Sequence, residues 1–132
     1  MFAPGDIVRI YAAQAGRKKY HLFVSAGVQG QAHRLLFLNS ETKYRDTLAV
    51  KCERISFLPQ SRTGLTGISC SQIARYTDKN LQDYRAEKLG VMPVDVLIEL
   101  RAFMDQVTSL TAIERRETAA ALDTMIVAIG GG

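Results

Sequence analysis

The chain has 132 residues, of which 47% are hydrophobic and 23% charged, and its formal net charge at pH 7 is +4. This composition is typical of a globular domain rather than of a disordered or fibrous chain, and no apolar run approaches the roughly 20 residues of a membrane-spanning helix. The chain does not begin with a basic stretch followed by a long apolar stretch, so we expect no signal peptide. We expect Cys52 and Cys70 to be reduced, buried thiols of a cytoplasmic protein.

The first 76 residues have the pattern of short strands separated by turns. The first strand is expected at 6–12 ("DIVRIYA"), which is β-branched and alternating and follows the turn pair Pro4-Gly5. Further strands are expected at 20–26, 33–40, 47–52, 54–59 and 68–76. Strands this short and this closely spaced fit a compact barrel or a strongly bent sheet.

The apolar period then changes to that of helices. Thr77 is a candidate N-cap for a helix over 78–89, with Leu81, Tyr84, Lys88 and Leu89 on one face, and Gly90 stands where a left-handed C-cap is expected. The pattern therefore predicts a first helix that ends at Gly90.

Two further helices are expected at the C-terminal end. Pro93 suits the first turn of one helix, and Thr111 and Glu114 have capping-box spacing ahead of another that ends near Ile129. The apolar stripes are Val94, Leu97, Ile98, Leu100, Phe103, Met104 and Val107 with Arg101, and then Ile113, Ala119, Leu122, Ile126 and Ile129.

The chain is thus expected to divide into a β-rich unit with its helix, residues 1–90, and a helical hairpin extension, residues 91–132. We expect the apolar stripes of the extension to pack on the strands or on each other. The alternative is that they extend a homodimer interface or cover a groove for a partner protein.

The positive charge is concentrated in the first half of the chain. Residues 1–66 hold ten Lys and Arg against four Asp and Glu, whereas residues 67–132 hold seven against nine. A basic unit favours polyanions such as nucleic acid, although the same asymmetry occurs in proteins that bind nothing charged.

Three cations, Arg17, Lys18 and Lys19, stand where a loop meets the second strand in "QAGRKKYHLFVS" (14–25). Cations at such a junction can meet a phosphate, arginine through bidentate contact and lysine as a point charge. The alternative is an exposed loop that its charges keep soluble.

Polar residues close the third strand. Asn39 and Ser40 could donate hydrogen bonds to a phosphate or a base edge, or could be ordinary strand terminators. Lys43, Tyr44 and Arg45 follow as a small basic-aromatic patch of the kind that stacks on unpaired bases. The two histidines, His21 and His33, fall on different strands and are expected to be structural rather than catalytic.

In combination these segments resemble the MazF/PemK family of toxin-antitoxin endoribonucleases. The resemblance rests on "PGDIVRI" (4–10), on 14–25 and on "TGLTGISCSQIARYTDKNL" (63–81), and it spans residues 4–89. It implies an α+β fold with a small SH3-like barrel, a homodimer, an antitoxin partner, and cleavage of single-stranded RNA without metal or cofactor. The alternative on the same barrel is a non-catalytic module that binds nucleic acid or protein.

The resemblance also implies site residues. Lys19, or Arg17 if the loop shifts by two, takes the place of the family's catalytic arginine, and Ser40 with its neighbour Asn39 takes the place of its hydroxyl residue. RNA-binding roles fall to Lys18, Lys43, Tyr44 and Arg45. The sequence departs from the family where an Arg-Pro pair becomes Lys19-Tyr20 and an aspartate becomes Ser71, which loses bidentate geometry at the first position.

Overall fold

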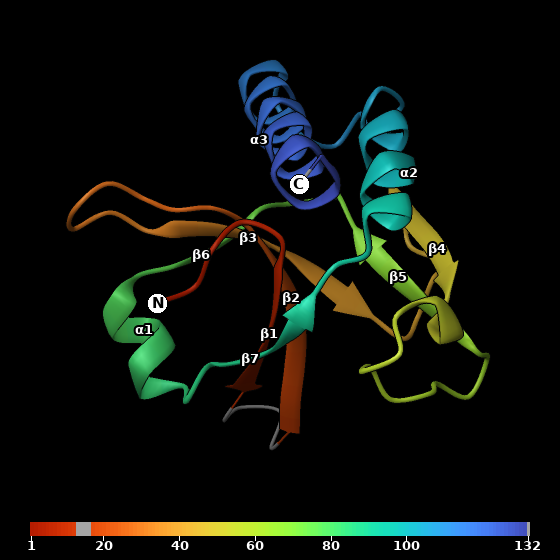
Figure 1. The fold of residues 1–132 in the computed structure, drawn as a ribbon, viewed down its shortest axis with the longest axis horizontal. Helices are drawn as coiled ribbons and strands as arrows, with labels where there is room; N and C mark the ends of the chain where they lie inside the picture. The colour runs from red at the N-terminus through yellow and green to blue at the C-terminus, as the bar shows by residue number, and fades with distance from the viewer. Residues whose placement is uncertain (13–16, 132) are drawn as a thin grey trace.

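The computed structural model describes residues 1–12 and 17–131, with Ala12 and Arg17 described by their backbone alone. In this part of the chain the architecture is α+β, with one antiparallel sheet and three α-helices (Figure 1). The strands are β1 (Asp6–Ala12), β2 (Arg17–Ser25), β3 (His33–Asn39), β4 (Thr47–Lys51), β5 (Leu65–Ser69), β6 (Ala74–Tyr76) and β7 (Glu87–Val91). The helices are α1 (Asp78–Asp83), α2 (Val94–Met104) and α3 (Ala112–Gly130), and a short 3₁₀ turn, η2, spans Cys52–Arg54.

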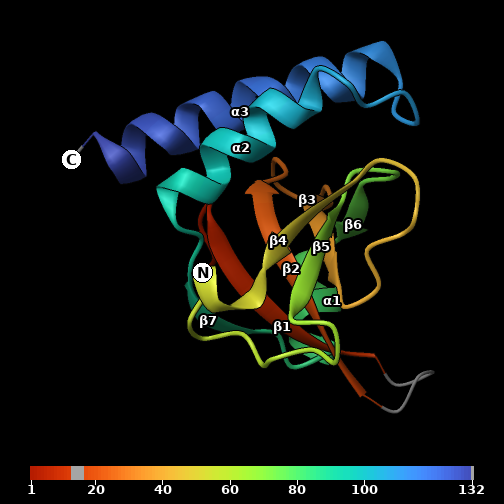
Figure 2. The ribbon, with the colours of Figure 1, turned by 90° about the vertical axis from the view of Figure 1, so that its right-hand side faces the viewer.

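The sheet has the strand order β4-β5-β3-β2-β1-β7. Strand β6 pairs with the first residues of β3, on the edge whose last residues pair with β5. The centre of the sheet is the meander β1-β2-β3, in which Tyr11 pairs with Lys18 and Tyr20 pairs with Leu38. The sheet curls rather than lying flat (Figure 2). The α+β class expected from the sequence is confirmed.

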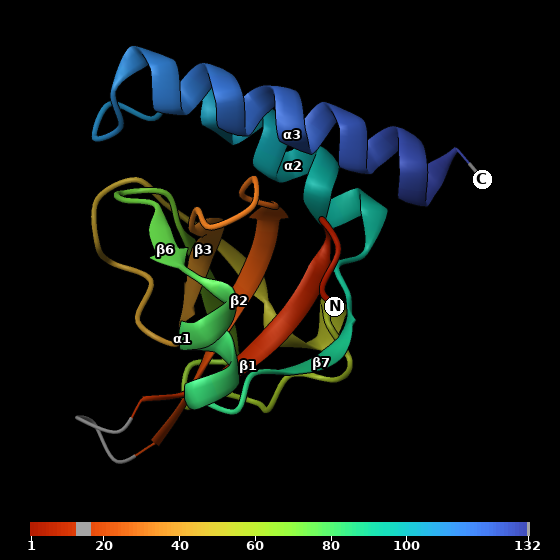
Figure 3. The ribbon, with the colours of Figure 1, turned by 90° about the vertical axis from the view of Figure 1, so that its left-hand side faces the viewer.

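Helices α2 and α3 lie side by side across one end of the strands (Figures 2 and 3). Their buried side chains share one apolar core with one face of the sheet: Ile7, Leu22, Leu36, Ile68, Leu97, Leu100, Met104, Leu122 and Met125. The expectation that the apolar stripes of the helical hairpin pack on the strands or on each other is therefore confirmed, and they do both. Two predicted stripe residues, Ile98 and Ile113, instead face outward and are more than half exposed.

A second, smaller core lies on the other face of the meander. It contains Val8 and Ile10 of β1, Phe23 of β2, Leu35 of β3 and Leu81 of α1. The alternation of β1 and β2 thus divides their buried side chains between two apolar cores.

The strand expected at 54–59 is wrong. Cys52–Arg54 forms a 3₁₀ turn, and successive local turns follow, with hydrogen bonds from the Ile55 N–H to the Cys52 carbonyl (2.9 Å) and from the Leu58 N–H to the Ile55 carbonyl (3.0 Å). Ile55 and Leu58 are buried in the larger core. An apolar run that is buried in a series of turns has the same composition as a buried strand, and the two differ only in where the backbone hydrogen bonds go.

The helix expected over 78–89 is wrong in its second half. Helix α1 ends at Asp83, Arg85 has a left-handed backbone with φ +53°, and the chain continues as β7, which pairs with β1. Gly90 is not a C-cap: a Cβ there would lie 2.6 Å from Cε1 of Phe57, so glycine allows this ring to pack against the strand. Pairing with β1 therefore outweighs the helical period.

The single strand expected at 68–76 is two strands. β5 pairs with the end of β3, through Leu38 and Ile68, while β6 pairs with its beginning, through His33 and Tyr76. The other expected strands and the helical hairpin are confirmed. Within residues 1–12 and 17–131, no helix combines the length and apolar character that a membrane crossing requires.

The thiols of Cys52 and Cys70 are free and buried, as expected. Burial raises the pKa of the Cys70 thiol to about 12. This thiol therefore stays protonated and unreactive at neutral pH.

Candidate nucleic-acid interface

Four of the predicted site residues come together at the end of the sheet that lies away from α2 and α3 (Figures 2 and 3). There the start of β2 and the end of β3 line a depression of about 150 Å³. Its lining is Lys18, Lys19, Tyr20, Phe37, Leu38, Asn39 and Ser40. We call it the β2–β3 depression.

The strand register explains this meeting. Because Tyr20 pairs with Leu38, the residues before Tyr20 on β2 lie beside those after Leu38 on β3. Alternation places Lys19 on the same face as Phe37, and the Lys19 ammonium lies 5.5 Å from the centre of the Phe37 ring. A cation held over an aromatic face is partly ordered before any ligand arrives.

Asn39 and Ser40 play different parts in the depression. The Asn39 side-chain Oδ1 accepts a hydrogen bond from the Glu41 backbone N–H (3.1 Å), which closes the strand locally. Ser40 is exposed, and its hydroxyl makes no hydrogen bond to another described residue. The Asn39 side-chain NH2 and the Ser40 hydroxyl are therefore both polar groups of the depression that can donate to a ligand.

Arg17 begins β2, where it pairs with Ala12, and its backbone therefore lies at the same end of the sheet. Its side chain lies outside the described residues. The structure therefore does not decide whether Arg17 or Lys19 corresponds to the arginine of the MazF/PemK family, and that correspondence stays a prediction. Of the two, Lys19 is the residue that lines the depression.

Lys43, Tyr44 and Arg45 do not line the β2–β3 depression. They belong to the connection between β3 and β4, and Tyr44 is 61% exposed. Arg45 Nη2 donates a hydrogen bond to Thr108 Oγ1 (2.9 Å) in the connection between α2 and α3. The predicted basic-aromatic patch is thus a separate surface, and one of its cations binds the helical hairpin.

Asp46, which the sequence analysis did not single out, anchors the connection between β3 and β4. Asp46 has a left-handed backbone (φ +55°), and its Oδ2 accepts hydrogen bonds from the Thr108 N–H (3.1 Å), the Ser109 N–H (2.8 Å) and the Ser109 hydroxyl (2.5 Å). The Ser109 hydroxyl is the largest cause that lowers the pKa of the Asp46 carboxyl. The sequence indicates this role only through the residue type, since aspartate tolerates a positive φ better than most residues.

Both histidines are buried, a placement that fits the structural role expected for them. His33 Nδ1 accepts a hydrogen bond from the Gly27 N–H (3.0 Å), which assigns the ring proton to Nε2, 2.5 Å from Asp78 Oδ1. His21 lies against the rings of Phe37 and Tyr76, and burial lowers its pKa to about 4. Neither imidazole lines the β2–β3 depression.

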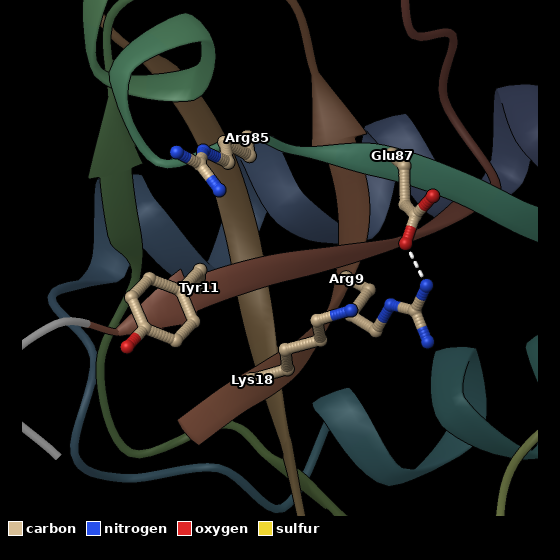
Figure 4. A pocket seen from close by; sticks show the side chains of 5 residues that line it. All are labelled: Arg9, Tyr11, Lys18, Arg85 and Glu87. Atoms are coloured by element: carbon tan, nitrogen blue, oxygen red, sulfur yellow. Dashed lines mark ion pairs between the residues drawn. The ribbon is translucent and has the colours of Figure 1, made fainter. Parts of the chain in front are cut away.

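A larger cavity of about 470 Å³ shares Lys18 with this depression, and Figure 4 shows its lining side chains. It is lined by Arg9 and Tyr11 of β1, Lys18 of β2, and Arg85 and Glu87 from the start of β7 and the turn before it. Of these residues the sequence analysis identified only Lys18. The others come from segments whose contact depends on the β1–β7 pairing, which the sequence did not predict.

The arrangement offers cations, a hydroxyl and an amide to a ligand. Lysine ammonium groups at the strand ends favour a phosphate, and the Ser40 hydroxyl can donate to its oxygens. In the described part of the chain, no three His, Cys, Asp or Glu side chains come together as a metal ion would need.

Comparisons with known proteins add no family assignment. No protein-family model matches the chain, and neither the curated proteins nor the solved structures contain a match.

Proposed function

We propose that this chain is a MazF/PemK-like protein with an SH3-like barrel, which binds single-stranded RNA at the β2–β3 depression and cleaves it without a metal. It would act as the toxin of a type II toxin-antitoxin system, as a cytoplasmic homodimer held in check by an antitoxin protein. The observation that supports this most is the meeting of Lys18, Lys19, Asn39 and Ser40 in one depression.

The depression has the charge that an RNA backbone requires. Lys18 and Lys19 supply two positive charges at the beginning of β2, and β3 contributes only uncharged side chains to the lining. A phosphate in contact with Lys19 would meet an ammonium already placed over the Phe37 ring. Electrostatic attraction of this kind gives most of the sequence-independent affinity for nucleic acid.

The proposed reaction uses the RNA's own nucleophile. The ribose 2′-oxygen attacks the neighbouring phosphorus while the bond to the 5′-oxygen breaks, which leaves a 2′,3′-cyclic phosphate and a 5′-hydroxyl. The Ser40 hydroxyl, as the proton shuttle, accepts the proton of the 2′-hydroxyl and passes its own proton to the departing 5′-oxygen, while the Asn39 side-chain N–H groups donate hydrogen bonds to the phosphate. Lys19 stabilises the negative charge that grows on the phosphate oxygens.

A second candidate function is binding without cleavage. Two observations favour it: Lys19-Tyr20 stands where the family has Arg-Pro, and neither imidazole reaches the depression as a proton acceptor. The protein would then use the same cations to hold nucleic acid or an acidic partner.

The test is incubation of the purified protein with single-stranded RNA in EDTA, followed by mapping of the new ends. Discrete cuts with 5′-hydroxyl ends that are lost in Lys19→Ala support the ribonuclease. Lys51→Ala is the control, because Lys51 is a strand lysine at the surface that does not line the depression. RNA that is bound through Lys19 but stays intact supports the binding module.

A further inference from the structure

The cavity beside the β2–β3 depression has an unequal charge balance. Three of its lining side chains are cationic, Arg9, Lys18 and Arg85, against the single carboxylate of Glu87. Arg9 forms an ion pair with Glu87, so these two charges offset each other (Figure 4). Lys18 and Arg85 form no ion pair or side-chain hydrogen bond with another described residue, which leaves their charges available to an anion.

An aromatic ring lies in the same cavity as these two cations. Tyr11 is the direct cross-strand partner of Lys18, so the ring and the lysine stem occupy one face of the β1–β2 ladder. Tyr11 is 41% exposed, so part of it is accessible to a ligand. Paired positions on adjacent strands have Cβ atoms about 5 Å apart, so one small ligand can contact both residues.

Arg85 reaches the cavity through an uncommon backbone conformation. Its φ of +53° follows α1 directly, and the turn is held by hydrogen bonds from the Arg85 N–H to the Gln82 carbonyl (3.2 Å) and from the Ala86 N–H to the Leu81 carbonyl (2.9 Å). The Tyr11 N–H donates to the Tyr84 carbonyl (3.0 Å), which ties this turn to β1. The backbone of Arg85 is therefore held near β1 by a hydrogen-bonded turn, and the Arg85 and Tyr11 side chains both line the cavity (Figure 4).

From this juxtaposition we infer that the cavity is a nucleotide-binding subsite, in which a base stacks on Tyr11 and its phosphate lies between Lys18 and Arg85. Base stacking on aromatic rings and phosphate contact with cations are the two usual components of single-strand recognition. Lys18 lines both this cavity and the β2–β3 depression, so one strand can occupy both. Its place as the neighbour of a scissile nucleotide rests on the proposed function, whereas nucleotide binding itself does not.

The test measures binding of two probes to the full chain: a fluorescein-labelled single-stranded RNA hexamer, by anisotropy, and an unlabelled 5′-nucleoside monophosphate, by NMR titration. Tyr11→Ala should weaken RNA binding by about 5-fold to 150-fold, the range for loss of one base stack. Tyr11→Phe keeps the ring and should bind within about twofold of the unaltered protein.

Arg85→Gly removes the guanidinium and suits the left-handed backbone. It should weaken binding and reduce the slope of log affinity against log salt by about 0.7, the value for one phosphate contact with a single strand. Arg62→Ala is the matched control, because Arg62 is exposed, lies in the turn before β5 and does not line the cavity. Thermal unfolding of each variant verifies that it folds.

The outcomes separate this inference from the proposed function. Loss of both probes in Tyr11→Ala supports a subsite for free and polymeric nucleotides, and loss of the RNA alone supports a subsite for the strand. Tyr11→Ala binding that equals the unaltered protein, or an unaltered protein that binds neither probe, overturns the inference. If RNA binding depends on Tyr11 but the RNA stays uncut, the subsite is supported and the ribonuclease is rejected. If cleavage depends on Lys19 and is unchanged in the Tyr11 and Arg85 variants, the ribonuclease is supported and the subsite is rejected.

Discussion

The Lys19 ammonium lies 5.5 Å from the centre of the Phe37 ring, across the pairing of β2 with β3. The contact restrains the Lys19 ammonium in the β2–β3 depression, whose lining also includes Asn39 at the end of β3 and Ser40 directly after it. A cation ordered in advance loses less side-chain entropy when it meets a phosphate.

Replacement of the ring should therefore lower RNA affinity without removing any charge. Phe37→Leu keeps an apolar side chain on β3 but removes the aromatic face beneath Lys19. We expect RNA binding to weaken by about 2-fold to 5-fold, which corresponds to an exposed cation–π contact of roughly 0.5–1 kcal/mol. Fluorescence anisotropy with a labelled RNA measures it.

The double variant Phe37→Leu/Lys19→Ala is the control for this prediction. If the ring acts through the ammonium, Phe37→Leu should have no further effect once Lys19 is alanine. Equal losses in both backgrounds would contradict the contact.

Acid should destabilise the protein through His21. Burial lowers the pKa of this imidazole from 6.5 to about 4, so between these pH values the unfolded chain binds a proton that the folded chain does not. Stability from this group is fully present above pH 6.5 and falls by about 3 kcal/mol as the pH drops to 4. Urea unfolding across this range measures the loss.

His21→Phe should remove this part of the pH dependence, because a phenyl ring carries no proton. The aromatic neighbours Phe37 and Tyr76 can accept such a ring. A variant that loses stability between pH 6.5 and 4 as steeply as the unaltered protein would contradict the assignment to His21.

The carboxylate of Asp46 should hold the β3–β4 connection to the helical hairpin. Asp46→Asn keeps a side chain that tolerates positive φ but weakens the acceptor for Thr108 and Ser109, and we expect a loss of about 1 kcal/mol at neutral pH. Since the folded-state pKa is lowered, the contribution exists above the ordinary range of an aspartate and is lost as the pH falls.

Arg45→Ala is the comparison for Asp46→Asn, because Arg45 donates only one hydrogen bond to the same helical connection. It should cost less than Asp46→Asn in the same urea unfolding experiment. The reverse order would show that Arg45, and not Asp46, holds the two segments together.

The close approach of β7 to Phe57 gives a fourth prediction. In Gly90→Ala the new Cβ would lie 2.6 Å from the Phe57 ring, so either the strand or the ring must move. We expect a loss of about 1–3 kcal/mol, the range for overpacking of a core. A smaller side chain in Phe57→Leu should remove most of this cost, and additive losses in the double variant would contradict the clash.

Much of the fold was predictable because its signals are local. The β-branched alternation of 6–12 and the capping box of Thr111 and Glu114 determine strand and helix within a few residues, and both are confirmed. β7 was missed because its formation depends on pairing with β1, more than 70 residues away in the chain. The strand expected at 54–59 was wrong for a different reason: Ile55 and Leu58 are buried as strand residues would be, but local turns and not a neighbouring strand satisfy their backbone hydrogen bonds.

The candidate site was likewise predictable only in part. Lys19 lies beside Asn39 because β2 and β3 are consecutive antiparallel strands in a register that pairs Tyr20 with Leu38, and the sequence pattern predicted both strands. The neighbouring cavity requires Arg85, whose position depends on a left-handed residue after α1 and on the register of β7. No short-range pattern in "DYRAEKLG" (83–90) distinguishes that turn from a continuing helix.

The most direct measurement is RNA cleavage in EDTA by the unaltered protein, Lys19→Ala and Lys51→Ala, with the new ends mapped. We predict discrete cuts with 5′-hydroxyl ends for the unaltered protein and Lys51→Ala, and a loss of cleavage of at least about 100-fold in Lys19→Ala, on the scale of a removed transition-state contact. RNA that stays intact with all three proteins, or equal cleavage by all three, would contradict a ribonuclease site at the β2–β3 depression.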